Sequence, residues 1–390
     1  MTNVKRRRII MKLKGVKIKL KPNESQKNQI DTNINLRRFV KNQLLNMQQT
    51  RYRNGGNYTS KFGMIYCLKA LKIEFPFLRQ AESTCLEYAC ADLDQSYQRF
   101  FKNQNDSPKF ESRKRPHNSY KSKCINNNIQ VVDNHAIKLP KLGTVKAYGL
   151  NRINGRIKSV VVHKDSAGIY TATIQVEHEP VELPKTNKQV GLDLGLADLV
   201  IQSDGFKLKN KKFERSLAKK RHAWERKLAR RRLQAKKKIE AAKKSGVELE
   251  WSSFKNVEKA RKMVAKINRK IANQREDYLQ KYTTQLVKEF DLIVMEDLKT
   301  KNLMKNKRLS RSIADSSWAK IKTMLQYKCD WYGKELILVA PQYTSQNCSS
   351  CGKNTGKKPL HIREFTCPHC GVHHDRDVNA GINILNKAFA

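Results

Sequence analysis

The chain has 390 residues, of which 80 are Lys or Arg and 35 are Asp or Glu, so its formal net charge is +45. Such a surplus repels itself in a folded chain unless a polyanion neutralises it, which favours nucleic acid as the partner. No apolar run approaches the roughly 20 residues of a membrane-spanning helix, and residues 1–15 lack the apolar core of a secretory signal. We therefore expect two or three domains, a nucleic-acid partner and no membrane contact.

The N-terminal part is predicted to be one strand followed by helices. Residues 11–21 alternate apolar side chains with Lys, which is typical of a strand with one buried face. Asn23 precedes Gln26 by three residues, the spacing of a capped helix start. Apolar residues then recur at helical intervals, so we predict an inserted helical domain over residues 23–104.

Residues 125–182 change to the period of two that marks β-strands. The dipeptide Asn154-Gly155 lies between two apolar stretches and predicts a two-residue hairpin turn. Several short strands joined by hairpins favour a small β-barrel, which the N-terminal strand would complete. The predicted barrel domain therefore consists of residues 1–22 and 105–186.

A second domain is predicted to begin with a hairpin over residues 188–206. Residues 207–290 then carry apolar side chains at helical repeats, which predicts a long helical hairpin. A bare coiled-coil hairpin would explain the apolar stripe, but 18 of the 38 residues from 207 to 244 are Lys or Arg. That charge density predicts that the outer face also contacts phosphates.

The C-terminal part alternates strands with helices. Residues 290–298 and 335–341 are apolar runs typical of buried strands, and residues 312–332 have helical spacing. They predict a mixed α/β domain that consists of residues 187–341 and 371–390. The predicted fold class is therefore α+β and multidomain.

Four of the nine cysteines form a C-x2-C-x15-C-x2-C pattern, made by Cys348, Cys351, Cys367 and Cys370. Two such knuckles supply four thiolates to a tetrahedral Zn²⁺ ion. Four thiolates leave no open position for water or substrate, so the ion would brace the chain rather than catalyse. We predict a structural zinc ribbon over residues 342–370, in which His369, His373 or His374 is a possible but unneeded replacement ligand.

Three carboxylates stand at the ends of predicted core elements. Asp193 ends the first strand of the 188–206 hairpin, Glu296 ends the apolar strand LIVME, and Asp377 stands at the start of the last helix. Each alone is more often a structural group at a strand end or a helix cap. If the three converge, their oxygens suit a pair of Mg²⁺ ions that hold the attacking and leaving oxygens of a phosphodiester.

These motifs resemble the TnpB family of transposon-encoded, RNA-guided DNA nucleases, which are relatives of the type V CRISPR effectors. The resemblance is carried by GLDLGLADLVIQSDG, LIVMEDL, RSIADSSWAKIKTMLQYKCDWYGKEL, the cysteine ribbon and DRDVNAGINIL, and it covers about half of the chain. It implies a RuvC-like nuclease domain with an RNase H fold, in which Asp193, Glu296 and Asp377 are the catalytic metal ligands. Asp375 is then a neighbour of the site.

The resemblance also concerns two further positions. Arg363 resembles an arginine at the ribbon edge of related effectors that approaches the scissile strand, although an exposed arginine on a ribbon needs no such role. Gly381 departs from the family, which commonly has Ala at this position. Glycine costs a helix up to about 1 kcal/mol relative to Ala, which should leave the chemistry intact.

The resemblance implies an endonuclease programmed by a guide RNA from the transposon end. The RNA would pair with one strand of a double-stranded target DNA, and a wedge barrel with the N-terminal helices would hold the RNA and a short flanking motif. Cleavage would be two-metal hydrolysis with two Mg²⁺ ions, while one Zn²⁺ is structural. We expect a monomer in the cytoplasm of a bacterial or archaeal cell, associated with the nucleoid through DNA.

Two alternatives belong to other classes of protein. A guide-dependent DNA-binding repressor would have lost cleavage, but Asp193, Glu296 and Asp377 are all present. A transposase, or an accessory protein of one, is the second. Tyrosine transposases need a His-hydrophobic-His pair, which is absent here, and three-carboxylate transposases typically order their acids Asp, Asp, Glu rather than Asp, Glu, Asp.

Overall fold

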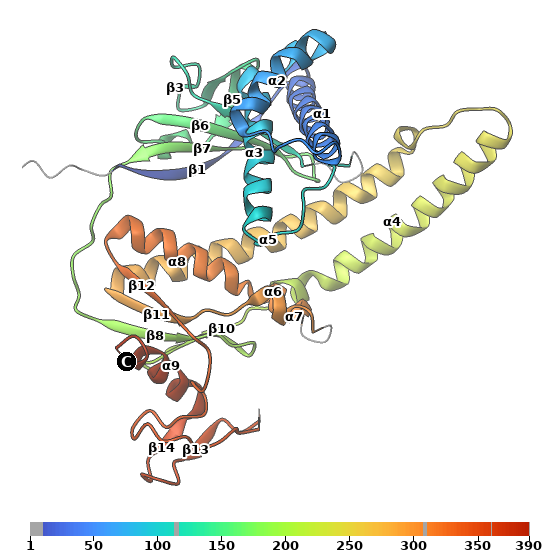
Figure 1. The fold of residues 1–390 in the computed structure, drawn as a ribbon. Helices are drawn as coiled ribbons and strands as arrows, with labels where there is room; N and C mark the ends of the chain where they lie inside the picture. Colours follow the sequence, from blue (N-terminus) through green and yellow to red (C-terminus); the bar gives the residue numbers. More distant parts are fainter. Residues whose placement is uncertain (1–10, 113–116, 307–309, 360, 390) are drawn as a thin grey trace, which may run out of the picture. The chain divides into compact units, whose positions relative to one another are not determined.

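A computed structural model describes residues 11–112, 117–306, 310–359 and 361–389 (Figure 1). The chain divides into two compact units, Met1–Glu179 and Pro180–Ala390. Each unit has its own hydrophobic core, and each is described by itself below.

The first unit contains a seven-stranded antiparallel sheet. Its strands follow the order β2-β6-β7-β1-β5-β4-β3. They are β1 (Lys12–Lys21), β2 (Ser119–Lys123), β3 (Gln130–Asp133), β4 (Ala136–Leu139), β5 (Gly143–Tyr148), β6 (Ile157–Lys164) and β7 (Tyr170–His178). The N-terminal strand β1 pairs with β7 and β5 and thus lies in the middle of the sheet.

The prediction of a closed barrel is wrong, because within the described residues the sheet ends at β2 and β3, and these two strands are not paired with each other. Strand β3 exposes every residue, so it offers no apolar face with which to close a barrel interior. Helical residues complete the core of the sheet instead, namely Ile30, Ile34 and Cys85.

Helices cover residues 24–101, as the periodicity predicted. They are α1 (Glu24–Arg53), α2 (Lys61–Glu74), the 3₁₀ helix η1 (Pro76–Gln80) and α3 (Ser83–Phe101). The predicted cap of α1 is confirmed: the Gln26 backbone N–H donates to Asn23 Oδ1 at 2.9 Å, and the Asn23 N–H donates to Gln26 Oε1 at 3.0 Å. A second core lies among these helices and includes Leu44, Leu68 and Leu86.

The predicted hairpin turn at Asn154-Gly155 is wrong. Residues Leu150–Arg152 form a short 3₁₀ helix, η2, rather than a strand, and β6 pairs with β2 and β7. Gly155 has a φ of 113°, and a Cβ at this position would lie 2.0 Å from the carbonyl oxygen of Glu177. The glycine therefore permits a close backbone approach, which sequence alone does not distinguish from a two-residue turn.

The second unit contains a mixed five-stranded sheet with the order β10-β9-β8-β11-β12. Its strands are β8 (Gln189–Asp193), β9 (Asp198–Gln202), β10 (Lys207–Lys209), β11 (Leu292–Glu296) and β12 (Glu335–Val339). Strands β8 and β9 form the predicted hairpin. Strands β8, β11 and β12 are parallel, so their carboxyl ends lie at one edge of the sheet.

Strand β11 is buried along its whole length because helices cover both faces of this sheet. Ile293 and Met295 pack in one core with residues of α5 (Lys255–Glu289) and α8 (Trp318–Tyr332). Leu292 and Val294 pack with Ile384 of α9 (Arg376–Asn386). This continuous apolar strand is typical of the centre of an α/β sheet.

The remaining elements extend from this sheet. Helix α4 (Phe213–Lys244), the 3₁₀ helix η3 (Trp251–Ser253) and α5 form the predicted long hairpin (Figure 1). The others are α6 (Thr300–Leu303), α7 (Ser310–Ser316) and the antiparallel pair β13 (Glu364–Thr366) and β14 (His373–Asp375). No helix in the described ranges combines the length and the apolarity that crossing a bilayer requires.

Candidate functional site

Two of the three predicted acids end neighbouring parallel strands. Leu192 of β8 is paired with Met295 of β11, and the next residue of each strand is Asp193 and Glu296 respectively. Because the strands run in the same direction, both carboxylates emerge at the same edge of the sheet. Glu296 is buried and Asp193 is partly buried.

The third acid, Asp377, is the second residue of α9, which lies on β8. The helix approaches the strand closely because Gly191 has no side chain where it faces the backbone of α9. A Cβ on Gly191 would lie 2.0 Å from the carbonyl oxygen of Gly381 and 2.8 Å from the backbone nitrogen of Leu385. Gly191 therefore allows α9 to sit directly against β8.

The charges of the three acids act on one another. Burial, together with the nearby charges of Glu296 and Asp377, raises the pKa of Asp193 to about 7. Burial also raises the pKa of Glu296, against the hydrogen bond that Thr344 Oγ1 donates to its Oε1 at 2.7 Å. The sheet edge is thus a place where negative charge accumulates in a poorly solvated environment.

The raised pKa of Asp193 predicts a pH-dependent stability. Between about pH 4 and pH 7 the folded chain holds a proton on Asp193 that the unfolded chain has released, because the pKa rises from 3.8 to about 7 on folding. Stability should therefore fall as the pH rises through this window, by an amount of the order of a few kcal/mol. In chelator-free buffer without added divalent ions, Asp193→Asn should raise the unfolding midpoint at pH 8 and change it little at pH 4. An equal change of the unfolding midpoint at both pH values would contradict the raised pKa of Asp193.

Asp375 and Asp377 have different surroundings. Asp375 caps α9, because its Oδ1 accepts from the backbone N–H groups of Asp377 at 2.9 Å and Val378 at 3.0 Å. Although burial opposes it, the hydrogen bond from Lys207 lowers the pKa of Asp375. The Asp377 carboxylate accepts instead from Arg363 Nη1, at 3.0 Å from Oδ2 and 3.3 Å from Oδ1. Capping is therefore done by Asp375, and the Asp377 carboxylate contributes to the charge at the sheet edge.

The donor set suits Mg²⁺, which prefers carboxylate oxygens. Asp193, Glu296 and Asp377 supply three such groups, and a divalent cation would favour the charged form of Asp193, which burial and the two neighbouring charges disfavour. Their oxygens do not form a compact cage: the only group of three or more candidate ligands within 4.8 Å of one another in the described ranges is made of cysteines.

The four cysteine sulfurs form that compact group, all lying within 4.8 Å of one another. The Sγ atoms of Cys348 and Cys370 are 3.7 Å apart, and so are those of Cys351 and Cys367. A tetrahedron with Zn–S bonds of about 2.3 Å has sulfurs about 3.8 Å apart. The cluster therefore fits a Zn²⁺ ion and is too open for disulfides, which need about 2.05 Å.

Histidine is not one of the four ligands in this cluster. His374 is buried on β14, and its Nε2 lies 3.1 Å from Cys348 Sγ. An N–H at Nε2 would donate to the thiolate, which is the role of an outer-shell partner that holds a metal ligand in place. His369 contacts the cluster only through its backbone N–H, which donates to Cys367 Sγ at 3.5 Å, whereas His374 contacts it with its side chain.

Three polar residues that the sequence did not single out tie the cysteine segment to the acids. Asn379 of α9 accepts from the Ser349 N–H at 2.8 Å and donates to the Asn347 carbonyl at 2.8 Å. Asn383, one turn later, donates to the carbonyls of Thr344 and Asn347. Thr344 in turn holds Glu296. The D-V-N-A motif could have pointed to Asn379, but the role of Asn383 and Thr344 appears only in the fold.

Removal of one zinc ligand should therefore disturb both sites. Cys348→Ser should lower bound zinc from one ion per chain to well below one and reduce the thermal stability of the second unit, because structural zinc contributes directly to folding. Cys67→Ser, at a partly buried thiol of α2 outside the cluster, is the matched control and should keep its zinc. Elemental analysis of both purified variants measures the bound zinc. Full zinc content in Cys348→Ser would contradict the assignment of Cys348 as a zinc ligand.

Three protein-family profiles match the chain. One is described as "Probable transposase" and covers residues 173–307. A second, "Cas12f1-like, TNB domain", covers residues 318–384. The third, "Helix-turn-helix domain", covers residues 11–57, which here form the strand β1 and the single long helix α1.

Curated proteins with similar sequences identify the family to which the chain belongs. A protein of Streptomyces pristinaespiralis named "Putative RNA-guided DNA endonuclease" is 34% identical over 81% of this chain and 74% of its own length. The Escherichia coli protein "Putative RNA-guided DNA endonuclease InsQ" is 30% identical over 97% of this chain and 93% of its own. A TnpB-like protein of Methanocaldococcus jannaschii is 31% identical over 30% of this chain and 53% of its own. The chain belongs to this family, the TnpB family.

Solved structures match more weakly. The Cas12f1–sgRNA–target DNA complex is 14% identical and covers 97% of this chain and 100% of that chain, with a TM-score of 0.34. CasPhi-2 bound to crRNA is 10% identical and covers 98% of both chains, with a TM-score of 0.43. The two superpositions are too loose to transfer geometry from those complexes to this chain.

Proposed function

We propose that the protein is an RNA-guided DNA endonuclease whose active site consists of Asp193, Glu296 and Asp377. The observation that supports this most strongly is that Asp193 and Glu296 end neighbouring parallel strands at one edge of the mixed sheet, where burial and the nearby charges of Glu296 and Asp377 raise the pKa of Asp193 to about 7. The strand order of that sheet also fits. If its five strands are numbered along the chain, they lie in the order 3-2-1-4-5, and only the second runs antiparallel to the others. This is the order of an RNase H-like fold. The relatives named as RNA-guided DNA endonucleases supply the class of substrate.

In this proposal the chain supplies the ligands and orients them. Asp193 and Glu296 would hold Mg²⁺ from the strand ends, Asp377 would hold it from α9, and the hydroxyl of Thr344 fixes the orientation of Glu296. Bound Mg²⁺ ions would supply an activated water and neutralise charge on the phosphodiester that is cut. Arg363, whose side chain is 56% exposed beside Asp377, offers a cation to the phosphate of the strand that enters the site.

The proposal also gives roles to the parts of the chain outside the acid site. The sheet of the first unit with its helices would be the wedge and recognition parts that hold the guide RNA and the flanking motif. The zinc ribbon would brace the start of α9, since Asn379 is hydrogen-bonded to the cysteine segment. The partners would be a guide RNA from the transposon end and a double-stranded target, bound by a monomer that acts on DNA in a bacterial or archaeal cytoplasm.

A repressor that binds DNA without cutting it is the second candidate. It shares the guide RNA and the target, so RNA binding alone does not separate the two. The coupled acids favour the nuclease, because a protein that only binds DNA gains nothing from three carboxylates that repel both one another and the phosphates.

The test of the guided function is to purify the chain from cells that carry its native locus and to sequence the RNA that accompanies it. We expect one dominant RNA species transcribed from the transposon end. A heterogeneous mixture of cellular RNA in proportion to its abundance would contradict the proposal.

A further inference from the structure

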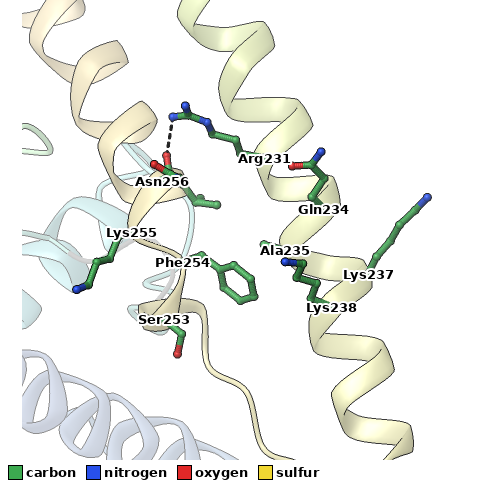
Figure 2. A pocket seen from close by; sticks show the side chains of 10 residues that line it. Arg231, Gln234, Ala235, Lys237, Lys238, Ser253, Phe254, Lys255 and Asn256 are labelled. Carbon is green, nitrogen blue, oxygen red and sulfur yellow. Dashed lines mark hydrogen bonds between the residues drawn. The ribbon is translucent and has the colours of Figure 1, made fainter.

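A cavity of about 690 Å³ lies within the helical hairpin, between the C-terminal half of α4 and the start of α5 (Figure 2). This volume is in the range of pockets that hold small organic ligands. Its wall on α4 includes Arg231, Ala235 and Lys238, and its wall on the other side includes Phe254 and Lys255. None of these residues belongs to the acid site or to the zinc ribbon.

The floor of the cavity is apolar and aromatic. Ala235 is only 1% exposed, and the partly buried ring of Phe254 projects between the two helices toward α4 (Figure 2). The exposed indole of Trp251 lies next to it, with the ring centroids 6.3 Å apart. The two ring planes are tilted by 58°, so a planar ligand would stack on the face of one ring, that of Phe254, which lines the cavity.

Cations surround this floor. Lys238 points toward the Phe254 ring, while Lys237 and Lys255 extend outward from the rim (Figure 2). Across the described ranges, no carboxylate lies within 4.0 Å of any of these three ammonium groups, whereas Lys236 next to them is paired with Glu240 at 3.6 Å. The first turn of α5 adds the partial positive charge of a helix N-terminus.

Arg231 gives the cavity a fixed wall. Its Nη1 donates to the backbone carbonyl of Asn256 at 2.9 Å (Figure 2), so the guanidinium bridges the two helices. The separation of α4 from α5 at this level is thereby held by a hydrogen bond as well as by the packing of Ala235. The aromatic floor can then receive a ligand without a prior movement of the helices.

The cavity therefore suits a ligand that has a planar group for the aromatic floor and negative charge on both sides of that group for the lysines. An unpaired nucleotide within a strand has these features. Its base would stack on Phe254, and the long side chains of Lys237 and Lys255, which extend outward from opposite rims in Figure 2, would turn inward to meet its 5′ and 3′ phosphates. A duplex alone needs no aromatic slot, because its bases are stacked on each other. An acidic peptide would satisfy the lysines and leave the aromatic floor unused.

We propose that this cavity binds one unpaired nucleotide of a single-stranded nucleic acid, with the base on Phe254 and the flanking phosphates on Lys237 and Lys255. The inference deepens the proposed function, since it rests on a nucleic-acid partner, but it does not require cleavage. The strand can be a looped part of the guide RNA or a displaced DNA strand, which share this chemistry.

The experiment uses the full chain and 12-nucleotide single strands, one RNA and one DNA, that carry the fluorescent base 2-aminopurine at every third position. Binding is followed without added divalent ions, so the result is independent of nuclease activity. Stacking of 2-aminopurine on an aromatic ring quenches its fluorescence, and the wild-type chain should quench it. A duplex of the same sequence and poly-glutamate serve as competitors and should displace the strand poorly at equal charge.

Two pairs of variants separate stacking from charge. Phe254→Leu should weaken binding about 5- to 140-fold, the range for loss of one base–aromatic stack, and should abolish the quenching, while Phe254→Tyr should retain both. Lys237→Gln with Lys255→Gln should reduce the slope of log affinity against log salt by about 1.4, as expected for two single-strand phosphate contacts. The matched control is Lys219→Gln with Lys220→Gln, two exposed lysines of α4 outside the cavity.

The preferred strand, RNA or DNA, identifies the source of the nucleotide. Quenching that persists in Phe254→Leu, or equal slopes for the rim pair and the control pair, would overturn the inference. Efficient displacement by poly-glutamate would overturn it as well, in favour of an acidic protein segment. If the cavity variants behave as expected while guided cleavage is absent, the nucleotide site stands and the proposed endonuclease function fails.

Discussion

Asp377→Asn should abolish cutting of target DNA in Mg²⁺ while binding of guide and target stays near the wild-type level. The substitution keeps the shape of the side chain and removes the charge that Asp377 contributes beside Asp193 and Glu296. Loss of an outer-shell partner of a metal ligand typically costs 10- to 100-fold, so loss of a ligand itself should cost more than about 100-fold. Asp193→Asn and Glu296→Gln should give the same phenotype, because residues that act as a unit are not additive.

Asp375→Asn is the matched control for Asp377→Asn. Asp375 caps α9 through its Oδ1, and Asn caps helices about as well as Asp, so this variant should fold and cut normally. Asp375→Ala removes the cap and should lower stability by about 1 kcal/mol, with cutting largely retained. Cleavage and gel-shift assays on each variant measure both quantities. Cutting that survives in Asp377→Asn and vanishes in Asp375→Asn would assign the metal-binding role to the other aspartate.

Gly191→Ala should destabilise the second unit by about 3 kcal/mol, at the upper end of the usual cost of overpacking. Its Cβ would lie 2.0 Å from the Gly381 carbonyl oxygen, and a backbone atom of a helix cannot rotate away as a side chain can. Relief requires α9 to move off β8, which also moves Asp377 away from Asp193. Activity should therefore fall even at temperatures where the variant is folded.

Gly381→Ala provides the comparison for this packing argument. A Cβ at Gly381 would meet Ser203 at 3.0 Å from its nitrogen and 3.2 Å from its Cα, a tight but less severe contact. Alanine also gains about 1 kcal/mol of helix propensity over glycine, so this variant should change stability by less than about 1 kcal/mol. Chemical unfolding of both variants measures the difference in stability. Equal destabilisation by the two would contradict the argument that Gly191, and not Gly381, is the glycine that the close packing requires.

Several elements of both units were predictable, because periodicity and capping are local properties. The Asn23–Gln26 cap, the hairpin that begins at residue 188 and the apolar strand before Glu296 were read from the sequence correctly. The four cysteines were predictable for the same reason, since the spacing within each knuckle is set by a few residues of chain.

Other features depend on contacts between distant segments. Gly155 was taken for a turn residue because the sequence does not show the Glu177 carbonyl beside it. The first-unit sheet was expected to close because strand patterns do not reveal that Ile30 and Cys85 from helices complete its core. Likewise, the link from Asn379 to the backbone of Asn347 exists only because α9 lies beside the cysteine segment.

The central claim is that Asp193, Glu296 and Asp377 form a nuclease site that a bound RNA directs to its target. One cleavage reaction tests it most directly: the chain purified with the RNA from its native locus, Mg²⁺, and two plasmid libraries that carry either the sequence matching that RNA or a scrambled sequence next to randomised flanking positions. We predict cuts only in the matching library, at members with one short flanking motif, and none with Asp193→Asn. Cuts in both libraries, or undiminished cutting by Asp193→Asn, would contradict the account.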